Sequence, residues 1–420
     1  MSSEANSQDQ HSQKKRSWIF SIGPGLVTAC VVIGPGSILT SSKVGATDGY
    51  SKSWVVVLAV IFMLTFTTLG AKLAVVSQQS NGDLVRKHAG RWLAILIGLS
   101  VFFISAGFQF GNNLGVHAAI ATYVDGDYWV ILFNAVALAF VFGFKNLYSA
   151  LEKLMTGFVG LMLVSFAINL FFAKPAVGEL AAGFVPSGLS EIGLPLLGLV
   201  GTTFVISAAY YQSYLVRFKG WQIKDLKSGM VDARVSAIIM ALITLMLMTT
   251  AAAVLRGKEL TSPADVANSL YPLFGEKGRI IFSLGLFSAA FSSFIVNSMI
   301  GGFILSDGFN LGSTPNDKIP RIMTGVVLVT GMGVALYAIK AQVSPVAAIV
   351  AAQAAVVIAS PVVAGTLLWL TNRKDIMGDY KNSRGLNAIA GIGFVLLLAM
   401  AYNTAVYKFY PMLLNFVGTS

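Results

Sequence analysis

Long apolar segments, separated by short polar ones, follow one another from Trp18 to the C-terminal end of the chain. Each is roughly 17–28 residues long, which as a helix is enough to cross a hydrocarbon core about 30 Å thick. The pattern predicts about eleven membrane-spanning helices and hence an all-α integral membrane protein. The predicted spans are residues 18–41, 54–77, 92–118, 128–144, 154–173, 191–216, 235–255, 280–305, 322–339, 345–370 and 387–409.

Two of the predicted helices contain interruptions near their centres. The first has Gly-Pro-Gly-Ser at residues 34–37, and the sixth has Gly-Thr-Thr at residues 201–203 followed by Ser207. Each interruption alone is typical of a packing glycine or a harmless kink. Both fall in the first helix of a group of five, so together they favour a transporter built from two inverted repeats, with its site near the middle of the membrane.

This repeat hypothesis divides the chain into four parts. Residues 1–17 are polar and end in three basic residues, which is typical of a flexible cytoplasmic tail. Residues 18–173 are predicted to form the first five-helix repeat, and residues 191–370 the second. Residues 371–420 are predicted to supply a loop and an eleventh helix.

The composition supports the membrane class. The 420 residues are 55% hydrophobic and 11% charged, whereas a soluble chain has about 25% charged residues. The mean hydropathy is +0.75. The single cysteine, Cys30, excludes a framework of intramolecular disulfides. A net charge of +11 suggests nucleic acid at first, but the distribution of the basic residues indicates membrane topology instead.

The basic residues alternate in density along the predicted loops. With the N-terminus inside, 19 Lys and Arg residues fall on the inner side and 8 on the outer side. The positive-inside rule therefore predicts a cytoplasmic N-terminus and an outer C-terminus in a cell (inner) membrane. We expect the lipid bilayer and a small inorganic ion as partners, no nucleic acid, and a monomeric protein.

Four stretches of the chain, in order, resemble a known family. "GPGLVTACVVIGPGSILTSSKVGATDGYSKSWVVVLA" resembles the first two helices of the NRAMP-type (natural resistance-associated macrophage protein) metal transporters. Three further stretches resemble later NRAMP segments: "LEKLMTGFVGLMLVSFAINLFFAKP", "GTTFVISAAYYQSYLV" and "LLWLTNRKDIMGDYKN". The resemblance covers nearly the whole chain. It implies the LeuT-like fold, in which two inverted five-helix repeats with broken helices 1 and 6, plus an eleventh helix, work by alternating access.

The residues that hold the metal in that family differ in this chain. NRAMP metal transporters have Asp-Pro-Gly-Asn at the first break, where this chain has Gly34 in place of the Asp and Ser37 in place of the Asn. In the sixth helix, the positions of the family's carbonyl-donating Ala, metal-binding Met and two His are occupied by Thr202, Val205, Ser207 and Gln212. The resemblance therefore implies the fold and the mechanism, but not transport of manganese or iron.

Acids and imidazoles are missing from the predicted middle of the membrane. All 18 Asp and Glu residues fall in tails, in loops or near helix ends, and the three histidines are likewise peripheral. Divalent cations need charged oxygen ligands, sulfur or imidazole to offset dehydration, although Mg²⁺ keeps several waters and is the least excluded. Proton-coupled carriers use Asp, Glu or His within the membrane. We therefore expect neither a dehydrated dication nor a proton relay.

The broken helices instead predict an anion site. The second halves of helices 1 and 6 are expected to begin near Ser37 and Ser207, both good N-cap residues, with positive dipole ends and free N–H groups at the centre. Such a site favours a small anion, and planar bicarbonate, with donor and acceptor atoms, is the best fit. Tyr210 and Tyr211 are equally compatible with a packing role. The predicted substrate-binding residues are Gly34, Gly36, Ser37, Thr202, Thr203, Val205, Ser207, Tyr210, Tyr211 and Gln212.

An anion that enters a negative-inside cell needs a driving ion. In LeuT-like carriers sodium can bind between helix-1 carbonyls and helix-8 hydroxyls, and no other cofactor is expected here. Hydroxyl pairs in membrane helices also bond back to their own backbone, so a packing role is the alternative. The predicted coupled-ion residues are Val31, Val32, Ser292, Ser293 and Asn297.

Together these observations predict a secondary active transporter for a small inorganic anion, with sodium as the candidate coupled ion. One alternative is a divalent metal carrier that holds a largely hydrated ion, Mg²⁺ or Mn²⁺, through Ser37, Thr202 and carbonyls. Another is a non-transporting sensor on a transporter scaffold. The sequence contains no Gly-Lys-Ser/Thr phosphate loop, no nucleophile–base constellation and no Cys/His metal spacing, so neither an ATP-driven pump nor an enzyme is expected.

Overall fold

The computed structural model describes residues 23–121, 123–124, 126, 128–187, 194–260, 263–341 and 345–409. All regular secondary structure in these ranges is helical. The predicted tail at residues 1–17 lies outside the described residues. The described helices of the first half are α1 (Pro24–Val32), α2 (Pro35–Asp48), α3 (Ser53–Ser77), α4 (Asn81–Ala89), α5 (Arg91–Ala121), α6 (Tyr128–Gly143), α7 (Leu147–Ala173) and α8 (Val177–Ala182).

The second half continues the same helical pattern. Its helices are α9 (Leu194–Thr203), α10 (Ile206–Phe218), α11 (Leu226–Val254), α12 (Pro263–Gly308), α13 (Lys318–Lys340), α14 (Pro345–Asn372), α15 (Lys374–Met377) and α16 (Arg384–Thr404). Short 3₁₀ turns at Ile223–Asp225 and Gly378–Tyr380 precede α11 and follow α15, and a π-helical turn at Ala405–Phe409 follows α16.

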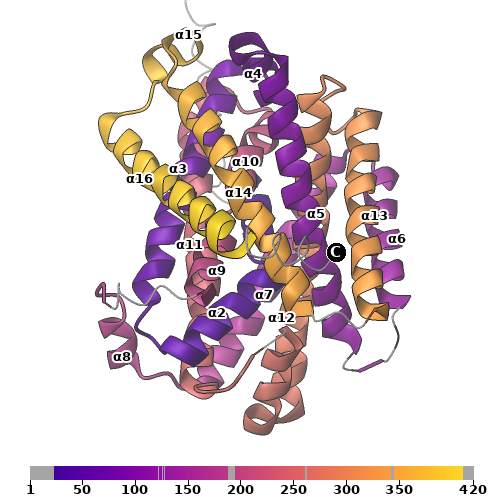
Figure 1. Cartoon of the computed structure of the whole chain (residues 1–420), viewed down its shortest axis with the longest axis vertical. Helices are drawn as coiled ribbons and strands as arrows, with labels where there is room; N and C mark the ends of the chain where they lie inside the picture. Colours follow the sequence, from indigo (N-terminus) through magenta and orange to yellow (C-terminus); the bar gives the residue numbers. More distant parts are fainter. Residues whose placement is uncertain are drawn as a thin grey trace, which may run out of the picture.

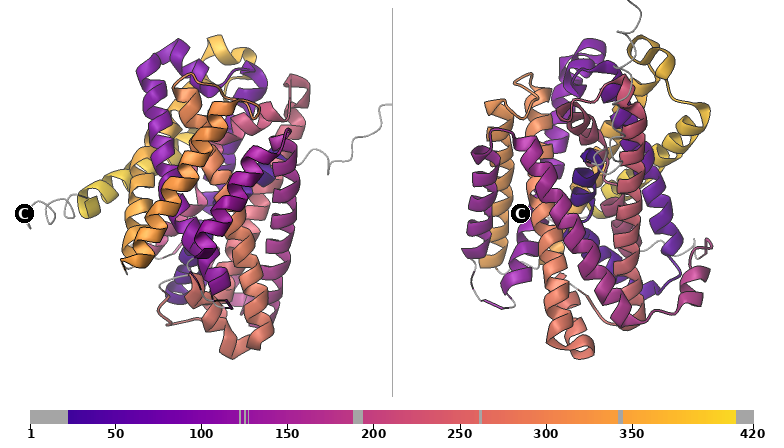
Figure 2. Two further views of the ribbon diagram at one scale, coloured as in Figure 1. Left: turned by 90° about the vertical axis from the view of Figure 1, so that its right-hand side faces the viewer. Right: turned by 180° about the vertical axis from the view of Figure 1, so that it is seen from behind.

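The long helices form one bundle, with α6 and α13 side by side at one edge and α16 running obliquely across the opposite side (Figures 1 and 2). The short helices α4 and α15 lie at one end of the bundle, and α8 lies at the other. Every residue of α1 is buried. A helix that is apolar all round is typical of a position enclosed by protein, and α1 lies in the interior among α7, α10, α11 and α12.

The predicted membrane class is supported by helix length and composition. Among the described residues, seven helices are long and apolar enough to cross a membrane, or eight if the bent pair α1–α2 is one span. The exact number of eleven spans, the four-part division of the chain and the orientation of the termini stay predictions.

Several helix ends differ from the predicted ranges. The first span was expected to end at residue 41, but α2 continues to Asp48. The eighth was expected at 280–305, but α12 extends over Pro263–Gly308 with a non-helical Gly275 inside it. The amphipathic helix α4 was not predicted, because it is short and polar. Its N-cap residue is Ser80, whose side chain accepts a hydrogen bond from the Asp83 N–H.

Close approach of α2 to α11 depends on a missing side chain. A Cβ placed on Gly45 would overlap the carbonyl oxygen of Met248 and lie 3.0 Å from the Cβ of Ala251. Neither neighbour is a flexible side-chain end, so only glycine permits this contact.

Gly45→Ala should therefore destabilise the protein by about 1–3 kcal/mol, as overpacking of a buried contact does. The measurement is thermal unfolding of the purified protein in detergent. Gly157→Ala in α7 is the matched control, because a Cβ there meets nothing within 4 Å and alanine is the better helix former. Equal melting temperatures for the two variants would contradict the assignment.

Candidate functional site

The first break separates α1 from α2. The helix α1 ends at Val32 and α2 begins at Pro35, with the two axes bent by 58°. Gly34 is extended (φ −109°, ψ −178°), and Pro35 has no N–H to contribute to a continuous helix. The interruption predicted at residues 34–37 is therefore confirmed.

The second break separates α9 from α10. The helix α9 ends at Thr203, and α10 begins at Ile206. Between them Val205 is extended (φ −84°, ψ 92°) and is the N-cap residue of α10. The predicted break in the sixth helix is confirmed, and it lies just after the Gly-Thr-Thr sequence that suggested it.

The two breaks contact each other, although they are more than 160 residues apart in the sequence. The Ser37 hydroxyl donates to the carbonyl of Val32 at the end of α1, and it lies 3.2 Å from the carbonyl oxygen of Thr202 in α9. The hydroxyl oxygens of Thr40 and Thr202 are 3.0 Å apart. Ser37 and Thr202 therefore lie together, as predicted, and Thr40 is an additional residue that sequence reasoning missed.

The expected capping by Ser37 and Ser207 is wrong. The N-cap residues are Gly34 and Val205, and in the described structure neither α2 nor α10 has a side-chain cap. The reason is that both helices begin earlier than expected, so that Ser37 and Ser207 lie inside their first turns, and the Ser37 hydroxyl bonds to a carbonyl group. The N–H groups of the first turns therefore keep no side-chain acceptor at either helix start.

Further polar groups at the second break are buried without partners. The hydroxyls of Thr203 and Ser207 have no hydrogen-bond partner among the described residues, and these residues are 1% and 0% exposed. A buried hydroxyl without a partner has a free-energy cost that a bound ligand or water can remove. Gly36 is half-buried and its carbonyl accepts from Thr40.

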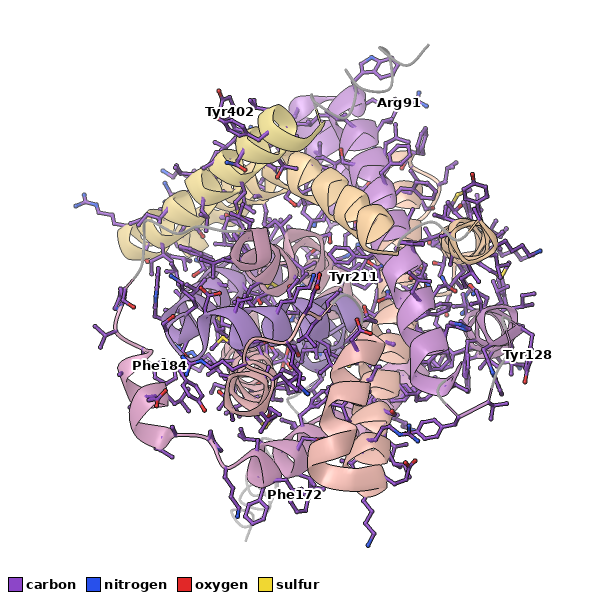
Figure 3. The ribbon with its side chains drawn as sticks, turned by 60° about the horizontal axis from the view of Figure 1, so that its bottom comes forward. Arg91, Tyr128, Phe172, Phe184, Tyr211 and Tyr402 are labelled. Carbon is purple, nitrogen blue, oxygen red and sulfur yellow. The ribbon has the colours of Figure 1, made fainter. Side chains whose placement is uncertain are left out.

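The predicted residues further along α10 lie away from this contact. Gln212 bonds to Thr28 of α1 and to Asp232 of α11. Tyr211 stacks on Tyr214 with ring centroids 5.6 Å apart, and its ring lies in the interior of the bundle (Figure 3). The backbone carbonyl of Tyr210 accepts from Asn81. The contacts of Gln212 and Tyr210 connect α10 to α1, α11 and α4, whereas the Tyr211–Tyr214 stack lies within α10.

The predicted coupled-ion residues are partly brought together. Ser293 lies with its hydroxyl 3.4 Å from the carbonyl of Val31, next to the buried Val32. Ser292 instead donates to the carbonyl of Ala289 in its own helix. The Asn297 amide faces α5, where its Nδ2 donates to the carbonyl of Ser105 at 2.7 Å.

Two carboxylates lie near helix ends, as predicted, but are fully enclosed by protein. Asp232 of α11 is 0% exposed and accepts from the backbone N–H groups of Gly23 and Gly25, at 2.8 and 2.7 Å, at the start of α1. Gln212 adds a third donor at 3.3 Å. These donors offset the loss of hydration that burial imposes.

Asp307 of α12 makes the equivalent contact with α4. It accepts from the Ser80 hydroxyl and the Gly82 N–H, each at 2.8 Å, and from the Tyr214 hydroxyl at 2.5 Å. Asp232 and Asp307 thus lie near helix ends, as the sequence predicts, but their enclosure by protein was not predicted.

Asp83 lies in α4, outside the spanning helices. Burial raises the pKa of its carboxyl group, but hydrogen bonds from Ser80 and Arg86 outweigh this effect, and the pKa lies below its ordinary value.

The described part of the chain contains no group of three or more His, Cys, Asp or Glu side chains that could hold a metal ion. No described hydrogen bond joins a carboxylate to residues 33–37 or 202–207. The side of Gly34 is instead lined by Ser293 and Asn112.

A helical membrane bundle in which two interrupted helices meet at their breaks defines the class of transporters with a broken-helix fold. The family model described as natural resistance-associated macrophage protein-like matches residues 25–407. The chain belongs to this family, and the predicted membership is confirmed.

Sequence relatives agree with this assignment. The divalent metal cation transporter MntH of Deinococcus radiodurans is 23% identical over 394 residues, which are 90% of this chain and 88% of the relative. The MntH protein of Erwinia tasmaniensis is 25% identical over 429 residues, which are 96% of this chain and 100% of the relative.

Solved structures support the fold. A variant of the Eremococcus coleocola manganese transporter is similar with a TM-score of 0.80 and 18% identity, over 95% of this chain and 88% of that one. MhsT in complex with L-phenylalanine has a TM-score of 0.61 and 16% identity, over 90% and 98% of the two chains. The predicted LeuT-like all-α fold is confirmed.

Removal of the Asp232 carboxylate tests its contact with α1. Asp232→Ala should leave the Gly23 and Gly25 N–H groups unpaired and raise amide hydrogen exchange in residues 23–32 by at least about tenfold. Mass-spectrometric exchange on the detergent-solubilised protein measures this. Asp375→Ala, at a carboxylate whose side chain is 51% exposed, is the control, and equal exchange in the two variants would refute the role of Asp232.

Proposed function

We propose that this protein is an alternating-access secondary transporter that carries a small inorganic anion, with bicarbonate as the best fit. The observation that carries the proposal is an imbalance of hydrogen-bonding groups at the two breaks. Carbonyl groups there have side-chain donors, whereas the N–H groups at the starts of α2 and α10 have no side-chain acceptor in the described structure.

Several carbonyl groups at the breaks have a side-chain hydroxyl nearby. The Ser37 hydroxyl donates to the carbonyl of Val32 and lies near that of Thr202, and the Ser293 hydroxyl lies near that of Val31. The Thr202 hydroxyl itself donates to the carbonyl of Gly198 at 2.9 Å. A divalent metal ion would need oxygens such as those of Val32 and Thr202, so their contacts with Ser37 weaken the case for a dehydrated divalent cation.

The donor side supports an anion. Two helix starts that contain free N–H groups and positive dipole ends favour negative charge. The buried, unpartnered hydroxyls of Thr203 and Ser207 add donors at the second break. Gly34 contributes no charged side chain to compete for these donors, and bicarbonate is small, planar and singly charged.

A divalent metal cation is the second candidate. The names of the sequence relatives favour it over bicarbonate, because both are divalent metal cation transporters. In this chain such an ion would have to stay largely hydrated, since the break offers hydroxyls and carbonyls without a bonded carboxylate among the described residues.

Sodium is proposed as the coupled ion in the anion mechanism. The Val31 carbonyl and the Ser293 hydroxyl are the two predicted ligands that lie together, while Ser292 and Asn297 have other partners. Inward anion movement against a negative-inside potential requires a coupled gradient, and sodium supplies one.

Gly34→Asp tests the substrate charge. A Cβ at Gly34 lies 3.0 Å from the Ser293 hydroxyl and 3.4 Å from Asn112 Oδ1, so a short side chain fits with a small shift. The new carboxylate should occupy the helix starts and lower uptake of radiolabelled bicarbonate into proteoliposomes by at least about tenfold. Manganese uptake is measured in parallel.

Gly34→Asn is the matched control, since it has the same shape without the charge and should therefore lose less bicarbonate uptake than Gly34→Asp. Equal bicarbonate uptake by the Asp and Asn variants would contradict the proposed site. Saturable manganese uptake by the wild-type protein, with no bicarbonate uptake, would establish the second candidate instead.

A further inference from the structure

A row of buried polar side chains starts at the first break and follows α5 toward its N-terminal end. Asn112, Gln109 and Ser105 lie at helical spacing on one face of α5 and are 2%, 0% and 0% exposed. Asn297 of α12 contacts the same row. The row is neutral throughout, and none of its members was predicted to contact substrate.

Asn112 is the member of the row next to the break. Its Oδ1 lies 3.4 Å from the position that a Cβ on Gly34 would occupy. Its Nδ2 faces the opposite way and lies 3.4 Å from Oε1 of Gln109. The side chain therefore presents a carbonyl oxygen toward Gly34, and this oxygen accepts no hydrogen bond from any described residue.

The orientation of Asn112 is set by Gln109. The Gln109 Oε1 also lies 3.4 Å from Nδ2 of Asn297, and that Nδ2 donates to the Ser105 carbonyl at 2.7 Å. Two amide NH₂ groups therefore face one oxygen. Reversal of the Asn112 amide would replace its contact with Gln109 Oε1 by an oxygen–oxygen approach, which is unfavourable.

We propose, on the basis of the anion function above, that Asn112 Oδ1 accepts a hydrogen bond from a hydroxyl group of the substrate. Gln109 acts as a positioning residue that keeps this oxygen toward the break. The backbone N–H groups at the starts of α2 and α10 hold the acceptor oxygens of the same anion. The site thus selects an oxyanion that carries a proton over one that has acceptors only.

Nitrate is the matched probe for this selectivity. It is planar and singly charged like bicarbonate, but it has no O–H donor, so its oxygens would face the lone pairs of Asn112 Oδ1. A site that is built to bond a substrate hydroxyl rejects an analogue without one, because the protein group is left unpaired.

The experiment is competition against radiolabelled bicarbonate uptake in proteoliposomes, with unlabelled bicarbonate and nitrate as competitors. For the wild-type protein, nitrate should need at least about tenfold higher concentration than bicarbonate for half-inhibition. Asn112→Leu should bring the two concentrations to within about twofold, because the acceptor that rejects nitrate is gone. In Gln109→Leu the Asn112 amide can turn, so the ratio of the half-inhibitory concentrations of nitrate and bicarbonate should be intermediate.

Asn169→Leu in α7 is the control, because Asn169 is buried and bonds to its own helix at Ser165; its ratio should equal that of the wild type. Asn112→Ala is a second variant in case leucine prevents folding. An unchanged ratio in both Asn112 variants overturns this inference alone. Wild-type proteoliposomes that take up no bicarbonate overturn the proposed function and this inference together.

Discussion

Backbone groups that are released where a membrane helix breaks must find partners inside the protein, because the lipid core offers none. Ser37 meets part of the carbonyl half of this requirement, since its hydroxyl donates to the Val32 carbonyl at the first break and its oxygen lies 3.2 Å from the Thr202 carbonyl oxygen at the second. The other half, the N–H groups at the starts of α2 and α10, has no side-chain acceptor in the described structure. The proposed anion site rests on this difference between carbonyls that have side-chain donors nearby and N–H groups that have no side-chain acceptor.

The broken helices also make hydrogen bonds at a distance from the contact between the two breaks. Asp232 binds the N–H groups at the start of α1, and Asp307 binds α4 and Tyr214 of α10. Carboxylates at helix starts satisfy backbone donors and complement the helix dipole. At these positions the protein supplies the acceptor itself, whereas at α2 and α10 it does not. Any rearrangement that moves α1 must exchange the Asp232 contacts for others, so these contacts belong to the conformation described here.

Features that depend on local sequence could be predicted. The membrane class follows from the long apolar segments, and the first break follows from Gly34 and Pro35. Features that depend on contacts between residues far apart in the sequence could not be predicted. Burial of Asp232 needs Gly23 and Gly25, more than 200 residues away, and the use of Ser37 on carbonyls needs Thr202. The role proposed for Asn112 could not be predicted either, because no sequence signal shows which end of its amide faces Gly34.

Membership in the Nramp family agrees with the fold, but Gly34 and Val205 stand where the resemblance described in the sequence analysis implies metal-binding side chains. The proposed anion and the metal carried by the named relatives differ in the sign of their charge, so direct binding separates them. Isothermal titration of the purified wild-type protein with bicarbonate, and separately with Mn²⁺, is the most direct measurement. The donor surplus at the two breaks predicts saturable binding of bicarbonate and none of Mn²⁺. Saturable binding of Mn²⁺ without any binding of bicarbonate would contradict it.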